Sequence, residues 1–537
     1  MRVADVIARC LADTGVKHAF GIPGGEILAL IDAFADADIQ FTTARHETAA
    51  GLMAEGASVH DGGVAVLAVT LGPGLSNAVN AVAQAALDRV PTVVISGAID
   101  ACLAGTFTHQ VFDQVALLAP LVKASFVAAG GSVAAMMAEA LAVACRHPQG
   151  PVHIDVPTSL FVADEPEVRG PERSLQTRVL PNESSLAPIA EALAGARRPL
   201  LLCGLECTSE ATSAALRALG DVCALPTLTT YKAKGVVDER ADASLGAMGL
   251  SPRADRIVLP LLRAADVVLL VGYDPVELRA AHIEPFAPGT RVLELAACAR
   301  THRMFQAELT AVGELSVSVS GLQRMLRASP PVVDPSWHEQ TRAAGELLRG
   351  QTIPGSGFGP LHVVEVLSRC LPPEVPLTLD TGAHRIVLSQ AFCARRPGQI
   401  LQSNGLCTMG YALPAAIGLS LASGSPVVAV MGDGGFEMVV GELATLRDLG
   451  LPVVLILFDD QSLALIDLKQ HALGYTRRGV WSGGTDYVAV ARAFGGHGAR
   501  VTDSAALEAE LARALARRDA FSVISCQLAR GAYEGLI

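Results

Sequence analysis

The sequence has few aromatic residues, few charges and no cysteine motif. Aromatic residues make up 4% and charged residues 18% of the 537 positions, whereas hydrophobic residues make up 51%. The 11 cysteines are scattered without a CxxC pair, and Cys203 and Cys207 are the two closest along the chain. Thiols spread in this way indicate a reducing compartment rather than a disulfide framework. The apolar composition excludes disorder as the general state.

Positive charge is also scarce. Lys and Arg number 41 against 53 Asp and Glu, and the net charge of -12 argues against a nucleic acid partner. Residues 64–87 carry no charge, but a Gly-Pro-Gly turn and several amide side chains within them predict a buried strand, a turn and a buried helix. The N-terminus lacks an apolar signal core. We therefore expect a cytoplasmic protein with no membrane segment.

Short β-branched runs alternate with Ala- and Leu-rich helical stretches throughout the chain. This alternation is typical of α/β domains with doubly wound, mainly parallel sheets. Charge and proline cluster at 164–173, and a second proline-containing stretch lies at 329–337. With roughly 150 residues per domain as a guide, we predict three domains, at 1–165, 184–328 and 356–537. The expected strands are 39–44, 64–70, 91–96 and 152–156, then 200–203, 267–271 and 291–295, then 376–379, 426–431, 452–458 and 521–525.

The strongest local signal lies in the third domain, where two strands end in acidic turns. The strand at 426–431 runs into Gly-Asp-Gly-Gly, which includes Asp433, and the strand at 452–458 runs into Asp-Asp-Gln-Ser, which includes Asp460. In a βαβ unit both aspartates lie at the carboxyl ends of parallel strands, where ligands bind. Two carboxylates with loop carbonyls suit Mg²⁺, and the glycines admit a diphosphate. The alternative is that each aspartate only caps a turn or a helix.

This stretch resembles a known cofactor-binding motif. Residues 432–462 are similar to the thiamin-diphosphate motif, in which GDG is followed some 25 residues later by an Asn-containing turn. The resemblance implies thiamin diphosphate and Mg²⁺ as cofactors, with Asp433, Asp460 and the carbonyl of Ser462 as metal ligands. Asp460 stands where Asn is usual. It still supplies an oxygen, but it adds negative charge beside a diphosphate.

The first domain supplies an independent match. After the strand at 39–44, a helix opens with Arg-His-Glu, and its Glu47 resembles the glutamate that activates the cofactor in this family. The resemblance implies a hydrogen bond from this carboxyl to the aminopyrimidine ring, which favours the tautomer that takes up the thiazolium proton. The alternative is a first-turn glutamate that only complements the helix dipole.

Four further segments resemble parts of the same family. Residues 70–77 are similar to its GPG-x-x-N turn, and 110–123 to the segment lining the substrate pocket in acetolactate synthase-like members. Residues 382–384 resemble a loop that touches the diphosphate, and 407–410 the turn that supports the bent cofactor. Each segment taken alone has an ordinary alternative, such as a plain Gly-Pro turn or core packing.

The resemblance assigns a role to each matching position. Glu47 and Gln110 are the expected catalytic residues, the carbonyl of Cys407 accepts from the cofactor's amino group, and Met409 wedges between its rings. The expected cofactor-binding residues are Gly24, Glu47, Pro73, Asn77, Gly382, Ala383, His384, Cys407, Met409, Asp433, Gly434, Gly435, Asp460, Ser462 and Leu463. The order along the chain is then a pyrimidine-binding domain, a central domain and a diphosphate- and Mg-binding domain.

Almost the whole chain takes part in the resemblance, which is closest to the acetolactate synthase-like branch. It implies C–C bond cleavage and formation on a 2-oxo acid. The turns at 23–25 and 71–73 lack the His or Ser of simple decarboxylases, which favours carboligation of a short acid such as pyruvate. Lys469 is a candidate for holding a substrate carboxylate. The expected pocket walls are Gly25, Gln110, Leu463, Leu465 and Ile466.

The sequence also departs from biosynthetic members of this branch. Lys469 aligns where they carry Trp, and Ala119 aligns where they carry Arg. Residues 245–251 and 271–274 resemble flavin-contacting loops only loosely, so the sequence gives little support for FAD.

Other functions and the assembly state remain open at this point. One alternative is a non-oxidative 2-oxo acid decarboxylase of broader substrate range. Another is a catalytically silent regulatory paralogue, against which the presence of Glu47 and Asp433 argues. A dinucleotide dehydrogenase is not supported, because no strand is followed by G-x-G-x-x-G. The resemblance implies a homodimer or homotetramer with each site shared between two chains.

Overall fold

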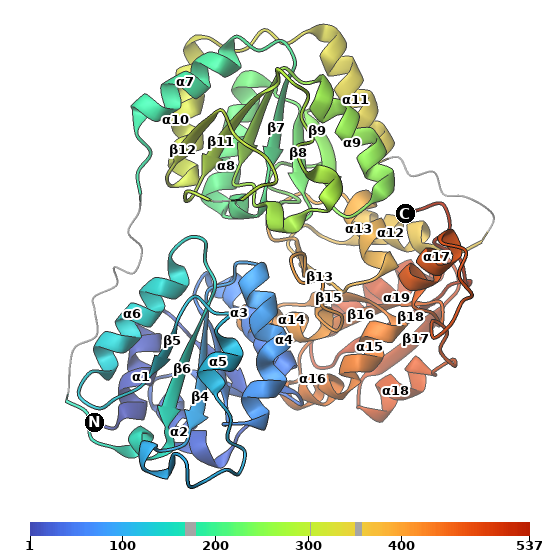
Figure 1. The fold of residues 1–537 in the computed structure, drawn as a ribbon. Helices are drawn as coiled ribbons and strands as arrows, with labels where there is room; N and C mark the ends of the chain where they lie inside the picture. Colours follow the sequence, from blue (N-terminus) through green and yellow to red (C-terminus); the bar gives the residue numbers. More distant parts are fainter. Residues whose placement is uncertain (167–178, 301, 350–356) are drawn as a thin grey trace.

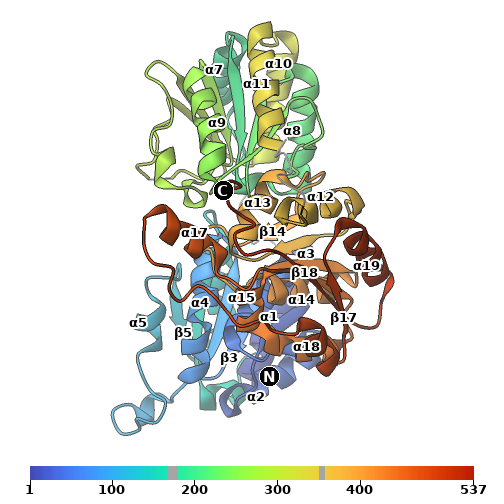
Figure 2. The same cartoon turned by 90° about the vertical axis from the view of Figure 1, so that its right-hand side faces the viewer.

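The computed structural model describes residues 1–166, 179–300, 302–349 and 357–537. They form three α/β domains, each built on a six-stranded sheet in which neighbouring strands run parallel. The central domain lies above the other two, which are side by side (Figure 1), and the rotated view agrees (Figure 2). The predicted fold class is confirmed. Residues 167–173 of the expected linker lie outside the described part of the chain.

The first domain has the strand order β2-β1-β3-β4-β6-β5. Helices α1, α2 and α6 cover one face of this sheet, and α3, α4 and α5 cover the other. The spacing of apolar residues decides which side of a helix packs against the sheet: α1 buries Val3, Ile7 and Leu11, which recur every four residues and so lie on one side of the helix. The strands are β1 (His18–Gly21), β2 (Gln40–Thr43), β3 (Ala65–Val69), β4 (Thr92–Ala98), β5 (Ser125–Val127) and β6 (Pro151–Pro157). The helices are α1 (Val3–Asp13), α2 (Leu28–Asp36), α3 (Glu47–Asp61), α4 (Pro73–Leu87), α5 (Gln114–Leu118) and α6 (Val133–Cys145).

The central domain has the strand order β12-β11-β10-β7-β8-β9. Helices α7, α8 and α10 pack on one face, and α9 and α11 pack on the other. The strands are β7 (Pro199–Cys203), β8 (Thr227–Thr230), β9 (Ser244–Met248), β10 (Val267–Val271), β11 (Arg291–Ala296) and β12 (Leu309–Val312). The helices are α7 (Glu183–Ala194), α8 (Glu210–Cys223), α9 (Pro252–Ala264), α10 (Leu315–Ala328) and α11 (Pro335–Arg349).

Helix α11 lies beyond the range 184–328 that the sequence predicts for the central domain. Its Trp337 is buried in that domain's core, and the indole nitrogen donates to the carbonyl of Pro199 at 2.8 Å. Residues 329–334 therefore connect two helices of one domain, and 335–337 are the first residues of α11, so the stretch 329–337 is not a boundary between domains.

The third domain repeats the topology of the first, with the order β14-β13-β15-β16-β18-β17. Helices α12, α13 and α19 cover one face, and α14, α15, α16 and α18 cover the other. The strands are β13 (Leu377–Leu379), β14 (Ile400–Gln402), β15 (Val427–Gly432), β16 (Val453–Asp459), β17 (His497–Val501) and β18 (Ser522–Gln527). The helices are α12 (Pro360–Cys370), α13 (Ala383–Ala391), α14 (Ala412–Ser423), α15 (Asp433–Val439), α16 (Leu443–Leu449), α17 (Ala464–Ala472), α18 (Tyr487–Ala493) and α19 (Ser504–Ala516).

The first and third domains share one hydrophobic core, which runs across the contact between α3 and α14. The two helices touch through glycines. A Cβ on Gly56 would lie 2.1 Å from the carbonyl oxygen of Ala415, and one on Gly418 would lie 1.9 Å from that of Met53. This contact fixes the helix that begins with Glu47 against the domain that carries Asp433.

Two whole-chain predictions concern cysteines and membranes. All eleven cysteines, which lie in the described residues, are free. None of the helices in the described ranges is both long and apolar enough to cross a bilayer.

Candidate functional site

The two predicted metal-binding aspartates lie at adjacent strand ends of the third sheet. Asp433 follows β15 and begins α15, and Asp460 follows β16, the parallel neighbour of β15. The strand order reverses between β13 and β15, so this edge is the topological switch point, where α/β sheets bind ligands. The side chains of both aspartates are buried.

The electrostatics of this pair fit a cation. Burial and the charge of Asp460 raise the pKa of Asp433 to about 7. Burial also raises the pKa of Asp460 to about 6. Asp433 accepts a hydrogen bond from its neighbour Gly434 through Oδ1, while its buried Oδ2 has no partner. An orphaned carboxylate oxygen beside a second carboxylate is a site that a bound cation would satisfy.

The turn after β16 is held in one conformation. Asp460 accepts a hydrogen bond from the Ser462 hydroxyl at 2.8 Å, and Gln461 between them has a positive φ of 56°. Ser462 forms an isolated bridge with Trp481, and the amide of Leu463 donates to the carbonyl of Val480 at 2.7 Å. The predicted ligand Ser462 therefore lies in a fixed turn next to Asp460.

Glycines after β15 leave no room for side chains. A Cβ on Gly435 would lie 2.0 Å from Asp380, and one on Gly434 would lie 2.8 Å from Leu463. Asp380 accepts from the amides of Gly410 and Tyr411 at 3.2 and 2.7 Å, and burial raises its pKa to about 6. A side chain at either glycine would therefore displace Asp380 or Leu463.

The loop at 382–384 meets the same strand ends. A Cβ on Gly432, the last residue of β15, would lie 3.2 Å from the ring of His384, which also packs 5.6 Å from the ring of Phe458. Gly382 precedes α13, and Ala383 begins it. Burial lowers the pKa of His384 to about 3, and its Nε2 has no partner. The imidazole is therefore neutral and has one free polar atom at the switch point.

The turn at 407–410 lies against α15 and Asp380. Cys407 has a positive φ of 57°, and its thiol donates to the carbonyl of Asn404 at 3.0 Å. The buried Arg385 donates to the same sulfur at 3.2 Å. The Met409 side chain lies 3.9 Å from the position of a Cβ on Gly434. Met409 is thus brought beside Gly434, the neighbour of Asp433, whereas the contacts of Cys407 are with Asn404 and Arg385.

A second group of predicted residues gathers in the first domain. Glu47 is buried at the start of α3 and accepts a hydrogen bond from the Asn77 amide at 3.0 Å. Thr48 donates to the carbonyl of Asn77 at 2.6 Å, so the two helix starts are joined. Pro73 is the first residue of α4 and lies on the surface.

Gly24 and Gly72 lie at neighbouring strand ends of this domain. A Cβ on Gly24 would lie 2.6 Å from Thr70, whose hydroxyl donates to Glu26. Gly72 has a positive φ of 64°, and a Cβ there would lie 2.5 Å from the carbonyl oxygen of Gln110. Gln110 itself is exposed.

The predicted residues thus form two groups rather than one. The contacts of Glu47 and Asn77 lie within the first domain, and those of Asp433 and Asp460 lie within the third. Within the described ranges, no group of three or more His, Cys, Asp or Glu side chains could hold a metal. The predicted ligand set, two carboxylates and a carbonyl, would not form such a group. The pocket residues Leu463, Ile466 and Lys469 are exposed on or next to α17.

Sequence reasoning missed three buried polar residues at these sites. Asp380 lies under the 407–410 turn, Arg385 contacts Cys407, and Gln114 accepts a hydrogen bond from the amide of Gly72 at 2.8 Å. Asp380 directly follows β13, so the strand-end pattern that identified Asp433 could have found it. No such signal marks Gln114, because its role depends on contacts between loops.

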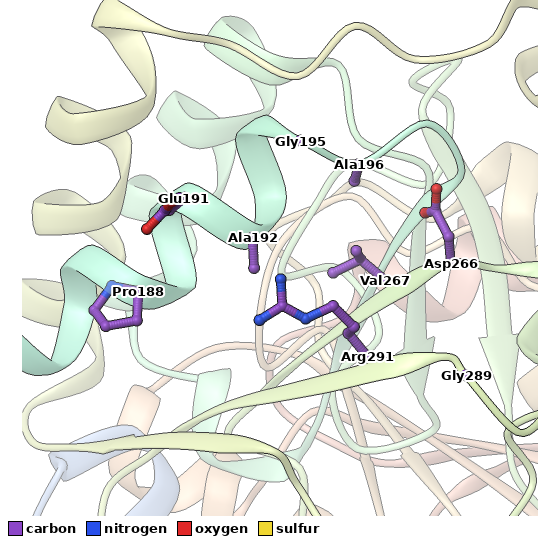
Figure 3. A pocket seen from close by; sticks show the side chains of 9 residues that line it. All are labelled: Pro188, Glu191, Ala192, Gly195, Ala196, Asp266, Val267, Gly289 and Arg291. Atoms are coloured by element: carbon purple, nitrogen blue, oxygen red, sulfur yellow. The ribbon is translucent and has the colours of Figure 1, made fainter.

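A cavity of about 620 Å³ lies elsewhere, at the amino ends of β10 and β11 in the central domain (Figure 3). Two of its three charged side chains are already engaged. Arg291 pairs with Glu308 at 2.8 Å, and Asp266 accepts from the amides of Arg197 and Arg198. This cavity lies in the central domain, away from the strand ends that carry Asp433 and Asp460, and is not part of the site.

Comparison with known proteins agrees with this geometry. The N-terminal TPP binding domain, the central domain and the C-terminal TPP binding domain of thiamine pyrophosphate enzymes match residues 1–117, 186–322 and 380–526. The large subunit of acetolactate synthase isozyme 1 of Escherichia coli (strain K12) is 30% identical, over 92% of this chain and 88% of its own.

Two further relatives carry similar names. The isozyme 2 large subunit of the same organism is 29% identical over 95% of this chain and 93% of its own. The acetolactate synthase of Bacillus subtilis (strain 168) is 29% identical over 93% of this chain and 88% of its own. The predicted resemblance is confirmed: the chain is an enzyme of the transferase or lyase type and belongs to the acetolactate synthase-like family of thiamin diphosphate-dependent enzymes.

Proposed function

We propose that this chain uses thiamin diphosphate and Mg²⁺ to join the acyl unit of a short 2-oxo acid, pyruvate in the first place, to a second carbonyl compound. The observation that carries the proposal is the buried pair Asp433 and Asp460, with an unpartnered Oδ2 on Asp433 at a topological switch point. A cation with diphosphate oxygens as its other ligands would satisfy that oxygen.

The residues around the pair fit the rest of the cofactor. Asp433, Asp460 and the carbonyl of Ser462 would hold the metal, and Gly434 and Gly435, which have no side chains of their own, would let a diphosphate approach the backbone. When bound, thiamin diphosphate supplies the carbanion that attacks the 2-oxo acid and stores its electrons as CO₂ leaves. Met409 packs beside Gly434, as a support for a bent cofactor would.

Glu47 is the proposed proton-transfer residue. It is buried at a helix start, and Asn77 orients it through a hydrogen bond to Oε2, which leaves Oε1 for a ring nitrogen. A carboxyl in this position would share a proton with a nitrogen of the aminopyrimidine ring, and this proton transfer would activate the cofactor.

Carboligation is favoured over aldehyde release by what the turns in the first domain lack. The residues at Gly24, Gly25, Gly72 and Pro73 have no imidazole or hydroxyl that could protonate the reacting carbon. The relatives described above are named as acetolactate synthases or their large subunits, which supports carboligation. Lys469 is exposed on α17, where its ammonium could meet a substrate carboxylate.

A dimer, or a tetramer of dimers, completes the proposal. Large apolar side chains are exposed in the two domains that carry Glu47 and Asp433, and a second copy of the chain would cover them. They are Leu28, Leu103, Phe107 and Phe112 in the first domain, and Met438, Leu463, Ile466, Leu473, Tyr475 and Trp481 in the third. Each site would then combine Glu47 of one chain with Asp433 of the other. The free cysteines agree with a cytoplasmic location.

Product analysis tests the function. Purified protein is incubated with pyruvate, thiamin diphosphate and Mg²⁺, and acetolactate and acetaldehyde are quantified. We expect acetolactate as the main product, and a chelator should abolish its formation until Mg²⁺ is restored. Acetaldehyde as the main product would replace the proposal with a decarboxylase. Turnover of longer 2-oxo acids but not of pyruvate would overturn the substrate and keep the cofactor.

A further inference from the structure

The central domain has its own topological switch point, between β10 and β7. In doubly wound sheets a dinucleotide binds in the crevice between the loops that leave two such strands. Here those loops close on each other. The amide of Gly204 donates to the carbonyl of Val271 at 2.9 Å, and a Cβ on Gly204 would lie 2.5 Å from the backbone of Gly272 and Tyr273.

One buried carboxylate, Glu206, crosses the crevice. Its own amide donates to the carbonyl of Gly272 at 3.1 Å, and its Oε2 accepts from the amide of Ala297 after β11 at 3.2 Å. Its Oε1 pairs with the guanidinium of Arg300, which also donates to the carbonyl of Tyr273 at 2.6 Å. A ring nitrogen of His147, in the first domain, also lies 3.8 Å from Oε1. The basic groups that face Glu206 in this cluster therefore belong to the protein itself.

A second buried side chain, that of Glu277, fills the other half of the crevice. Its Oε2 accepts from the amide of Leu205 after β7 at 3.1 Å, and its Oε1 accepts from the amide of Lys232 after β8 at 3.3 Å. Strand-end amides of this kind are the groups that bind a ligand's diphosphate in open α/β sheets. In this chain three of them, from β7, β8 and β11, are satisfied by two glutamates.

The same loops are tied to the other two domains. Asp274 accepts from the Arg89 guanidinium of the first domain at 2.8 Å, and Glu277 accepts from the Asn404 amide of the third at 3.3 Å. Lys232 pairs with Asp88 of the first domain at 2.8 Å. A dinucleotide in the crevice would have to break contacts among all three domains and place its diphosphate beside three acidic side chains.

We propose that the nucleotide crevice of the central domain is closed by the chain's own Glu206 and Glu277, so that this domain takes no flavin or other dinucleotide and serves as a clamp between the two cofactor-binding domains. The residues at the switch point do not fit FAD. The inference goes beyond the proposed function, since it concerns a different domain and holds for any reaction at the thiamin diphosphate site.

Ligand binding to the wild-type holoenzyme tests the closed crevice. The protein is purified from riboflavin-supplied cells, its absorption spectrum is recorded, and FAD and ADP are titrated by calorimetry up to about 1 mM. We expect no flavin absorbance, no saturable heat and the same specific activity with and without added FAD. Flavin bound at one per chain, or saturable FAD or ADP binding, would overturn the inference without touching the thiamin diphosphate assignment.

Two variants test the clamp. Glu277→Ala removes the acceptor for three donors that lie in three loops, so the midpoint of thermal unfolding should fall by at least about 2–4 °C. Glu191→Ala, on the exposed face of α7, is the matched control and should leave the midpoint unchanged. Equal midpoints for Glu277→Ala and wild type would show that Glu277 does not hold the loops and would overturn the clamp.

Discussion

Asp433 and Asp460 repel each other at the ends of β15 and β16, and both are buried. The family's usual Asn at the second position would avoid this repulsion. Asp460→Asn keeps an oxygen ligand and removes one negative charge, so we expect activity within about threefold of wild type and Mg²⁺ affinity at least as tight. Activity against Mg²⁺ concentration measures both quantities.

The contrasting variant is Asp433→Asn. It removes the carboxylate whose Oδ2 has no partner, and we expect Mg²⁺ and cofactor binding to fall together. Loss of cofactor binding in Asp460→Asn, with Asp433→Asn unaffected, would reverse the proposed roles of the two aspartates.

Substitution of Glu47 tests the proposed activation of the cofactor. Glu47→Gln keeps an oxygen that can accept from Asn77, but it cannot share a proton with a ring nitrogen. We expect kcat to fall by about 10²–10⁴, with little change in the unfolding midpoint. Glu139→Gln, on the exposed surface of α6, serves as the control. Turnover of Glu47→Gln within twofold of wild type would refute the role.

At the scale of elements, the crossing of α3 and α14 sets the distance between the first and third domains. Gly56→Ala would place a Cβ 2.1 Å from the carbonyl oxygen of Ala415, so the helices must separate. We expect a loss of stability of about 1–3 kcal/mol, with lower activity because α3 carries Glu47. Gly220→Ala in α8 is the control, since it meets no atom within 4 Å and should stabilise by about 0.5–1 kcal/mol. Denaturant unfolding of both variants measures the difference.

Elements with a strong local pattern could be predicted from the sequence. The expected strands at 200–203, 267–271 and 426–431 correspond to β7, β10 and β15, because buried parallel strands are short runs of apolar residues. Asp433 and Asp460 could be paired because a βαβ unit places consecutive strand ends side by side.

Features that depend on contacts between distant segments could not be predicted. The proline-containing stretch at 329–337, which runs into the start of α11, gives a linker pattern, whereas burial of Trp337 against the central sheet is a tertiary contact. Gln114 and Glu277 are likewise ordinary polar residues in sequence, and only their buried partners give them a role. The closure of the central crevice therefore had no sequence signal beyond a poor match to flavin loops.

At the scale of the whole molecule, the junction of the three domains makes stability depend on pH. Burial and the nearby Asp274 raise the pKa of Glu277 to about 7, although hydrogen bonds from Leu205 and Asn404 oppose this and Lys232 lies nearby. The folded state then binds more protons than the unfolded state between pH 4.5 and 7, so stability falls as pH rises through this window.

Glu277→Gln removes this titration. The stability of the variant relative to wild type should rise from pH 4.5 to 7, by about 3 kcal/mol if the whole shift is expressed. Unfolding midpoints of both proteins across this range measure the difference. Glu308→Gln is the control: hydrogen bonds with Arg291 lower the pKa of Glu308 from its usual 4.5, so its effect on stability lies mainly below this range and should be nearly flat from pH 4.5 to 7. A difference between wild type and Glu277→Gln that is flat with pH would contradict the prediction.

Assembly decides whether one chain suffices for a site. The contacts of Glu47 lie in the first domain and those of Asp433 in the third, and exposed apolar side chains flank both. If each site combines the first domain of one chain with the third domain of another, Glu47→Ala and Asp433→Ala chains are each inactive alone. After joint unfolding and refolding in equal amounts, half of the dimers are hybrids, and one of the two sites in each hybrid carries neither lesion. We expect about a quarter of wild-type activity, measured as acetolactate formed per chain. Recovery near zero, with hybrids detected by mass spectrometry, would place both residues of a site in the same chain.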